Sequence, residues 1–361
     1  MKYSVTKLTT KSNSNINYIF ENYPHLLEDK IKDPYFIQLL YTLIHKSIKP
    51  LDYTLTTEDA IPFIEKNHFL SENIRQHINE TKYTLYTIQF KIKENIINVK
   101  LHANQININK YIYFIQLILN MCINESKQPN SQYHITFYLT PFEKNEPTTS
   151  IDPQHVNSGF SKYNGEIVIF RKEEWFKVFI HECFHLFCLD FNEVNIDFKK
   201  IFSVLFFIKS EFLFFESLVE FWARTINIAV VSFFTKKNIS YEEFETLMEI
   251  NIAIEKVFST IQMNHVLSCV QTSYDEIITK PTDYTETTNA FCYYVLPAIL
   301  FSHYEQTMAW FVEHNETLLQ FKKNTEHVYM FYQYIRSIYK LPSVIDKYNL
   351  NMNMSAFDID F

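Results

Sequence analysis

Glycine is almost absent from this 361-residue sequence, which contains only Gly159 and Gly165. Glycine takes the left-handed backbone conformation at the ends of many helices, because it has no Cβ to clash. Most helices here must therefore end without it. Asparagine tolerates the same conformation and is heavily used in this chain, so we expect asparagine to occupy many of these positions.

Cysteine is scarce as well, and its spacing shows no disulfide pattern. The five cysteines are an odd number and include no C-x-x-C pair, which predicts reduced thiols. The first residues, MKYSVTKLTTKSNSNINY, lack the apolar stretch of a secretory signal. We therefore expect a cytoplasmic protein that is not secreted.

The chain has neither an excess of positive charge nor a long uninterrupted apolar run. Its net charge of −8 argues against nucleic acid or an anionic membrane as the main partner. The most apolar region, residues 201–234, is broken by charged side chains well before the ~20 apolar residues that a bilayer requires. No membrane span and no nucleic-acid partner are expected, and the sequence does not predict the oligomeric state.

Local patterns predict an α+β fold that is predominantly helical. β-Branched and aromatic runs favour a hairpin over 83–90 and 96–101 and strands over 133–140 and 166–170. Helical periodicity is clear over 35–44 and 109–124, and it extends over most of the chain after 197. The expected sheet is small, and mixed or antiparallel.

The most informative segment is Phe179-Ile180-His181-Glu182-Cys183-Phe184-His185-Leu186, which carries the pattern H-E-x-x-H. On a helix, residues four apart lie roughly 40° apart around the axis, so His181 and His185 project from one face. Two such imidazoles can bind one zinc ion, and Glu182 can act as the general base. The apolar flanks predict a buried helix, in which these polar groups need partners. The pattern therefore indicates a zinc hydrolase.

A catalytic zinc ion usually has a third protein ligand. Asp190 could bind the ion or orient a ligand. A better candidate segment is Phe214–Asn227, in which Glu216 and Glu220 stand four apart on an apolar helix. We favour Glu220 as the ligand because the small Ala223 one turn later allows a close helix approach. Glu216 is the alternative ligand, or the partner that holds the ring N–H of a histidine.

HECFH, followed by Glu220-Phe221-Trp222-Ala223, resembles the gluzincin branch of zinc metallopeptidases, in which a later helix supplies a glutamate ligand. The metzincin spacing does not fit, because Cys188 and Phe191 stand where that branch has glycine and the third ligand. Residues 133–228 also resemble uncharacterised metallopeptidase-like proteins of large double-stranded DNA viruses. The resemblance implies a zincin-like core, Zn²⁺ as cofactor, a peptide or protein substrate, and the host cytoplasm or a virion as location.

Combining the patterns with this resemblance gives a division into three parts. Residues 1–78 form an N-terminal helical lobe, 79–238 the zincin-like core with the H-E-x-x-H helix, and 239–361 a large helical C-terminal lobe. The transition-state donor stays open among Tyr293, Tyr294 and His303.

Two alternatives to a zinc peptidase remain. One is a zinc hydrolase of a non-peptide bond; a deformylase-like site would need Cys122 as a ligand, and its helical context argues against this. The other is a non-catalytic, virion-associated structural protein that retains a zincin fold.

Overall fold

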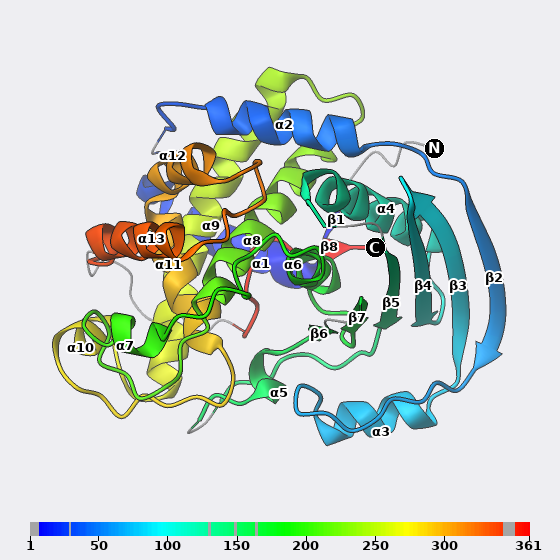
Figure 1. The fold of residues 1–361 in the computed structure, drawn as a ribbon, viewed down its shortest axis with the longest axis horizontal. Coiled ribbons are helices and arrows are strands. Elements are labelled where there is room, and N and C mark those ends of the chain that lie inside the picture. Colours follow the sequence, from blue (N-terminus) through cyan, green and yellow to red (C-terminus); the bar gives the residue numbers. More distant parts are fainter. Residues whose placement is uncertain (1–6, 29, 129–130, 148–149, 163–164, 342–350) are drawn as a thin grey trace.

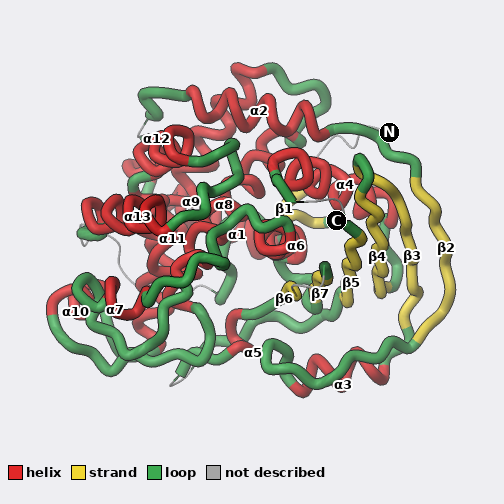
Figure 2. The backbone as a smooth tube through the Cα atoms, viewed as in Figure 1, coloured by secondary structure: helices red, strands yellow, loops and turns green. Residues whose placement is uncertain are grey.

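The computed structural model describes residues 7–28, 30–128, 131–147, 150–162, 165–341 and 351–361. Most strands gather at one side of the molecule and most helices at the other, with helix α6 (Trp175–Leu186) between them (Figure 1, Figure 2). The prediction of a largely helical α+β fold is confirmed. None of the helices in the described ranges combines the length and apolarity that a membrane crossing requires.

A mixed six-stranded sheet forms the strand side. Its strands, in spatial order, are β2 (Tyr53–Ala60), β3 (Tyr83–Ile92), β4 (Asn95–Ala103), β5 (Gln132–Tyr138), β7 (Glu166–Ile169) and β6 (Gly159–Lys162). Strands β4, β5 and β7 run parallel, whereas β2–β3, β3–β4 and β6–β7 are antiparallel pairs. Strands β2 and β6 therefore form the two edges of the sheet.

The predicted hairpin and the predicted strands over 133–140 and 166–170 are confirmed within a few residues. Strand β2 lies in a region that the sequence predicts to be only helical, so this part of the prediction is wrong. Its residues from Tyr53 to Asp59 are all exposed, so β2 carries no alternation of buried and exposed side chains. Pairing with β3 along its whole length defines it instead.

Helices account for most of the remaining elements. They are α1 (Thr10–Asn22), η1 (Pro24–Leu27), α2 (Tyr35–Ser47), α3 (Glu72–Glu80), α4 (Ile108–Glu125), α5 (Pro153–Val156), α7 (Phe198–Phe202), α8 (Phe214–Phe233), α9 (Tyr241–Cys269), α10 (Tyr274–Thr279), the π-helix η2 (Phe291–Val295), α11 (Leu296–Ser302), α12 (Tyr304–His314) and α13 (Thr325–Ile338). Two short strands, β1 (Lys7–Leu8) and β8 (Ile359–Asp360), form a separate antiparallel pair. The first and last described residues therefore lie side by side.

Helix α8 is the centre of the helical side. Nearly all of its residues are buried, as expected for a helix that is apolar around its whole circumference. It contacts α6 on one side and α2, α9, α11 and η2 on others. Helix α6 in turn contacts α4 and strands β6 and β7, so it connects the sheet with the helical side. One continuous hydrophobic core includes residues from all three predicted parts of the chain.

The expectation that asparagine occupies many of the left-handed positions is wrong for the described residues. Of the six described non-glycine residues with positive φ, only Asn238 is an asparagine; the others are Lys93, Gln105, Glu174, Cys188 and Gln271. Two of these, Glu174 and Cys188, flank α6. Tertiary contacts at these ends thus outweigh the local preference for asparagine.

Gly159 allows edge strand β6 to lie close to β7 and α6. A Cβ at this position would lie 2.6 Å from Ile169 Cδ1 and 3.0 Å from Val178 Cγ1. We predict that Gly159→Ala lowers the free energy of unfolding by about 1–3 kcal/mol, because the added methyl group overpacks this contact. Denaturant unfolding measures this loss. The control Lys162→Ala on the same strand changes an exposed side chain and should cost under about 0.5 kcal/mol; equal losses would contradict the packing argument.

Candidate metal centre

The ends of helix α6 set the position of its two histidines. Glu174 precedes the helix in a left-handed conformation (φ 53°), and Val178 N donates to Glu174 O at 3.0 Å. At the other end Cys188 is left-handed (φ 48°), and Leu189 N donates to Phe184 O at 2.8 Å. This turn reverses the chain directly after the helix. Asp190 thereby returns to the face of the helix that carries His185.

Helix α8 packs against α6 and supplies the glutamates. Glu216 lies in the first turn of α8, and Glu220 lies one turn further along. Their spacing places both carboxylates on the side that faces the histidines. They contact different nitrogens of the same imidazole ring.

Three ligand atoms converge on one point. Glu216 Oε2 lies 3.1 Å from His181 Nε2 and 3.2 Å from His185 Nε2, and the two Nε2 atoms are 3.3 Å apart. Among the described residues, His181, His185 and Glu216 are the only group of three or more His, Cys, Asp or Glu side chains arranged to hold an ion. The side chains of His181, His185 and Glu216 keep 8%, 12% and 11% exposure, so solvent reaches the group.

This spacing suits zinc. Ligands at about 2.0–2.1 Å from a tetrahedral zinc ion lie roughly 3.3 Å from one another. The three observed separations are close to that value. Two imidazoles and one carboxylate are also a typical ligand set of catalytic zinc sites. The donor set and its spacing therefore fit the ion.

Each histidine has an acid at its other ring nitrogen. Glu220 Oε2 lies 3.0 Å from His181 Nδ1, and Asp190 Oδ2 lies 2.5 Å from His185 Nδ1. An Nδ1–H that donates to a carboxylate leaves Nε2 of a neutral imidazole as a lone-pair donor. Both Nε2 lone pairs then face Glu216 Oε2. Such an arrangement is unfavourable unless a cation or a proton lies between these atoms.

The local electrostatics favour positive charge at this point. Burial lowers the pKa of His185, but the charges and hydrogen bonds of Glu216 and Asp190 together outweigh burial and raise this pKa well above its usual range. Burial likewise opposes ionisation of Glu216, yet His185 and His181 together lower the pKa of Glu216 to about 2. Glu216 therefore remains a carboxylate. In the absence of a metal ion, a proton on a histidine balances its charge.

The structure places Glu216, rather than the favoured Glu220, beside both Nε2 atoms. Glu220 is fully buried and accepts hydrogen bonds from Lys177 Nζ at 2.9 and 3.0 Å and from Arg224 Nε at 2.8 Å. Both oxygens of its carboxylate thus already have partners, namely two cations and the His181 ring. This geometry therefore favours Glu216, the expected alternative, as the ligand, and Glu220 as the partner of the His181 ring. In the sequence, the position of Arg224 four residues after Glu220 is the feature that could have indicated this buried ion pair.

Glu182 lies next to the group, on the side of strand β6. It is buried, and burial raises the pKa of its carboxyl. Ser161 of β6 donates a hydrogen bond to it. The predicted general base is thus near Ser161 of the edge strand, and it is not one of the three converging ligands.

Of the three proposed donors, Tyr293 lies beside the group. Its ring centroid is 5.6 Å from that of His181 in an edge-to-face arrangement, and Arg224 Nη2 donates to Tyr293 O at 2.6 Å. Burial and the charge of Glu216 raise the pKa of Tyr293 well above its usual range, so its hydroxyl keeps its proton. Tyr294 instead donates to Met352 O at 2.7 Å. His303 lies where α11 meets α12, and Ser302 directly precedes it in α11.

The cysteine ligand of the deformylase-like alternative is not part of this group. Cys122 is buried on α4, beside Cys183 of α6, and neither thiol is among the converging atoms. All five cysteines are free thiols, which agrees with the expectation from their spacing.

No protein-family model matches this chain, and no curated protein matches it. The arrangement of His181, His185 and Glu216 is therefore the main basis for assigning a function.

We predict that Glu216→Gln removes a ligand and Glu220→Gln does not. Glu216→Gln should abolish stoichiometric zinc binding, whereas Glu220→Gln should weaken it by about 10–100-fold, as is typical when the partner of a ligand is lost. Competition with a chromophoric chelator measures both affinities, and elemental analysis measures zinc content. Full zinc content in Glu216→Gln, with none in Glu220→Gln, would restore Glu220 as the ligand.

Proposed function

We propose that this protein is a zinc-dependent, gluzincin-like peptidase with a zincin-like core formed by the sheet, α6 and α8. The observation that carries this proposal is the convergence of two Nε2 atoms and one carboxylate oxygen within 3.1–3.3 Å of one another. The ligand side chains keep some exposure to solvent, and the adjacent Glu182 supplies a base. A purely structural zinc site is normally closed by four protein ligands.

His181, His185 and Glu216 would hold the ion. When bound, zinc lowers the pKa of water toward about 7 and polarises a carbonyl group. Glu220 and Asp190 keep the two imidazoles in the tautomer that offers Nε2. The chain thus supplies three ligands and fixes their orientation before any substrate arrives.

Glu182 is the general base of the proposed reaction. Its carboxylate takes a proton from the attacking water and delivers it to the amine nitrogen as the peptide bond breaks. The buried surroundings of Glu182 suit this double role, because burial raises its pKa and favours a carboxyl that can both accept and release a proton.

Tyr293 is the proposed donor to the oxygen of the attacked carbonyl. Its hydroxyl keeps its proton and lies in the same buried surroundings as Glu216 and Glu182, whose charges influence it. The π-helix η2 places Tyr293 next to the His181 ring. A fixed donor at this point stabilises negative charge that develops on the carbonyl oxygen.

The proposed substrate is an extended peptide that pairs with edge strand β6. Strand β7 is paired on both sides, whereas β6 has one unpaired side and forms an edge of the sheet. Ser161 of β6 also bonds to Glu182, so a peptide added along this strand would pass the base.

Replacing Glu182 separates metal binding from hydrolysis. We predict that Glu182→Gln keeps one zinc ion per chain and lowers peptide cleavage by about 10²–10⁴-fold, the usual contribution of a general base. Mass spectrometry of a diverse peptide library measures cleavage, and elemental analysis measures zinc. Glu193→Gln, which changes an exposed carboxylate, is the matched control. Wild-type protein with full zinc but no cleavage would favour the non-catalytic alternative or hydrolysis of another bond.

Removing only the hydroxyl of Tyr293 tests the proposed donor. Tyr293→Phe should lower kcat by about 10²–10³-fold, as for other lost oxyanion donors, with KM and zinc content nearly unchanged. Steady-state kinetics on the best peptide from the library measures this effect. Tyr294→Phe, whose hydroxyl bonds to Met352 instead, is the control. An equal loss in both variants would remove Tyr293 from this role.

A further inference from the structure

Residues 351–361, here called the docked segment, run through the interior although little of the segment is regular structure. Met352, Asn353, Met354, Ser355, Ala356, Phe357, Asp358 and Ile359 are all buried. Only Ile359 and Asp360 belong to a strand, β8. Buried backbone of this kind needs hydrogen-bond partners from elsewhere in the chain.

Two buried glutamates supply many of these partners. The carboxylate of Glu174 accepts from Met354 N at 2.9 Å and from Ser355 N at 3.0 Å. The carboxylate of Glu255 accepts from Ala356 N at 2.9 Å and from Ser355 Oγ at 3.1 Å. Further bonds join Gln262 to Asn351 and Asn353, Tyr294 to Met352, and Asn227 to Phe357.

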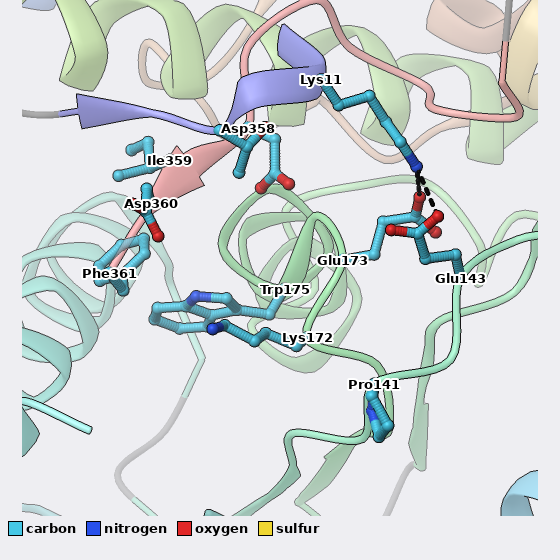
Figure 3. Close-up of a pocket in the computed structure, with 11 residues that line it drawn as sticks. Lys11, Pro141, Glu143, Lys172, Glu173, Trp175, Asp358, Ile359, Asp360 and Phe361 are labelled. Atoms are coloured by element: carbon cyan, nitrogen blue, oxygen red, sulfur yellow. Dashed lines mark hydrogen bonds and ion pairs between the residues drawn. The ribbon is translucent and has the colours of Figure 1, made fainter. Parts of the chain in front are cut away.

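The outer end of the docked segment is fixed by packing and strand pairing. Phe361 contacts the rings of Trp175 and Tyr111, with centroids 4.5 and 5.1 Å away. Figure 3 shows Asp358 to Phe361 beside Trp175, at a pocket that also contains the ion pairs of Lys11 with Glu143 and Glu173. This end lies at the first turn of α6, away from the turn that carries His185.

The inner end contacts the groups behind the metal centre. Lys177 Nζ lies 3.0 Å from Met354 Sδ and 2.9 and 3.0 Å from the two oxygens of Glu220. Glu220 in turn holds His181 Nδ1 at 3.0 Å. Lys177 is only 2% exposed, and Met354 is one of the side chains in direct contact with its ammonium. An unbroken series of contacts therefore runs from Met354 to a metal ligand.

We propose that the docked segment positions the metal centre: Met354 closes off Lys177, which holds Glu220 against His181. This inference rests on the proposed zinc site. It states that the zinc affinity of this site also depends on the docked segment, which is far from the ligands in the sequence. Met354 and Lys177 are positioning residues, since neither contacts the converging ligand atoms.

Zinc affinity would depend on Met354 because a buried ion pair and a hydrated ion pair differ in how firmly they fix their side chains. In a buried environment, Lys177 and Glu220 attract each other strongly and have no competing partner. If water reaches Lys177, the pair resembles a surface ion pair, which fixes its side chains weakly. Glu220 then orients the His181 ring less well. Zinc affinity falls, because the ring must be fixed again when the ion binds.

Full-length variants at the two ends of the docked segment test this inference. Met354→Ala should weaken zinc binding about tenfold or more, whereas Met354→Leu, which refills the volume, should stay within about threefold of wild type. Phe361→Ala should lower the melting temperature at least as much as Met354→Ala, because it removes buried aromatic packing. Its zinc affinity should nevertheless remain within about threefold of wild type. Chelator competition and thermal unfolding measure the two quantities separately.

A double-mutant cycle with Lys177→Met gives a second readout. Met354→Ala should not weaken zinc binding further in the Lys177→Met background, because both changes act through the same contact. Wild-type affinity in Met354→Ala, equal affinity losses in Met354→Ala and Phe361→Ala, or additive effects would each overturn the inference. Absence of zinc binding in the wild type would instead refute the proposed function.

Discussion

The buried carboxylate of Glu220 is the interaction on which the candidate centre depends. It has no exposure to water, and Lys177, Arg224 and the His181 ring surround it. Removing one partner of such a group leaves a buried charge without compensation, which costs several kcal/mol. The carboxylate is therefore fixed, and it fixes the His181 ring in turn. Asp190 does the same for His185 through the turn at Cys188.

The sequence predicted much of this arrangement, because helical spacing alone places His181 and His185 on one face and two glutamates on another helix. It favoured Glu220, whereas the geometry favours Glu216, and spacing alone could not distinguish them because both lie on the same side of α8. That choice depends on how α8 is rotated and shifted along α6, which is a property of packing. Strand β2 was missed for a related reason: its side chains are exposed, and only its pairing with β3 defines it. The assignment of three domains and of catalysis stays a prediction.

The contacts of the docked segment could not be predicted from sequence patterns. Its bonds join Met354 to Glu174 and Ala356 to Glu255, residues that lie 180 and 101 positions apart. No local periodicity reports such contacts. These contacts nevertheless resemble those of the candidate metal centre, because in both places buried carboxylates are paired with buried donors. The carboxylates of Glu174, Glu220 and Glu255 form ion pairs with three buried cations, Lys144, Lys177 and Arg224. Backbone amides of the docked segment donate further hydrogen bonds to Glu174 and Glu255.

The proposed function depends on the binding of one zinc ion by His181, His185 and Glu216. X-ray absorption spectroscopy at the zinc edge of the purified protein tests it most directly. We expect one zinc ion per chain with nitrogen and oxygen neighbours at about 2.0–2.1 Å and the outer scattering of two imidazole rings. Absence of zinc, or sulfur neighbours at about 2.3 Å, would contradict it.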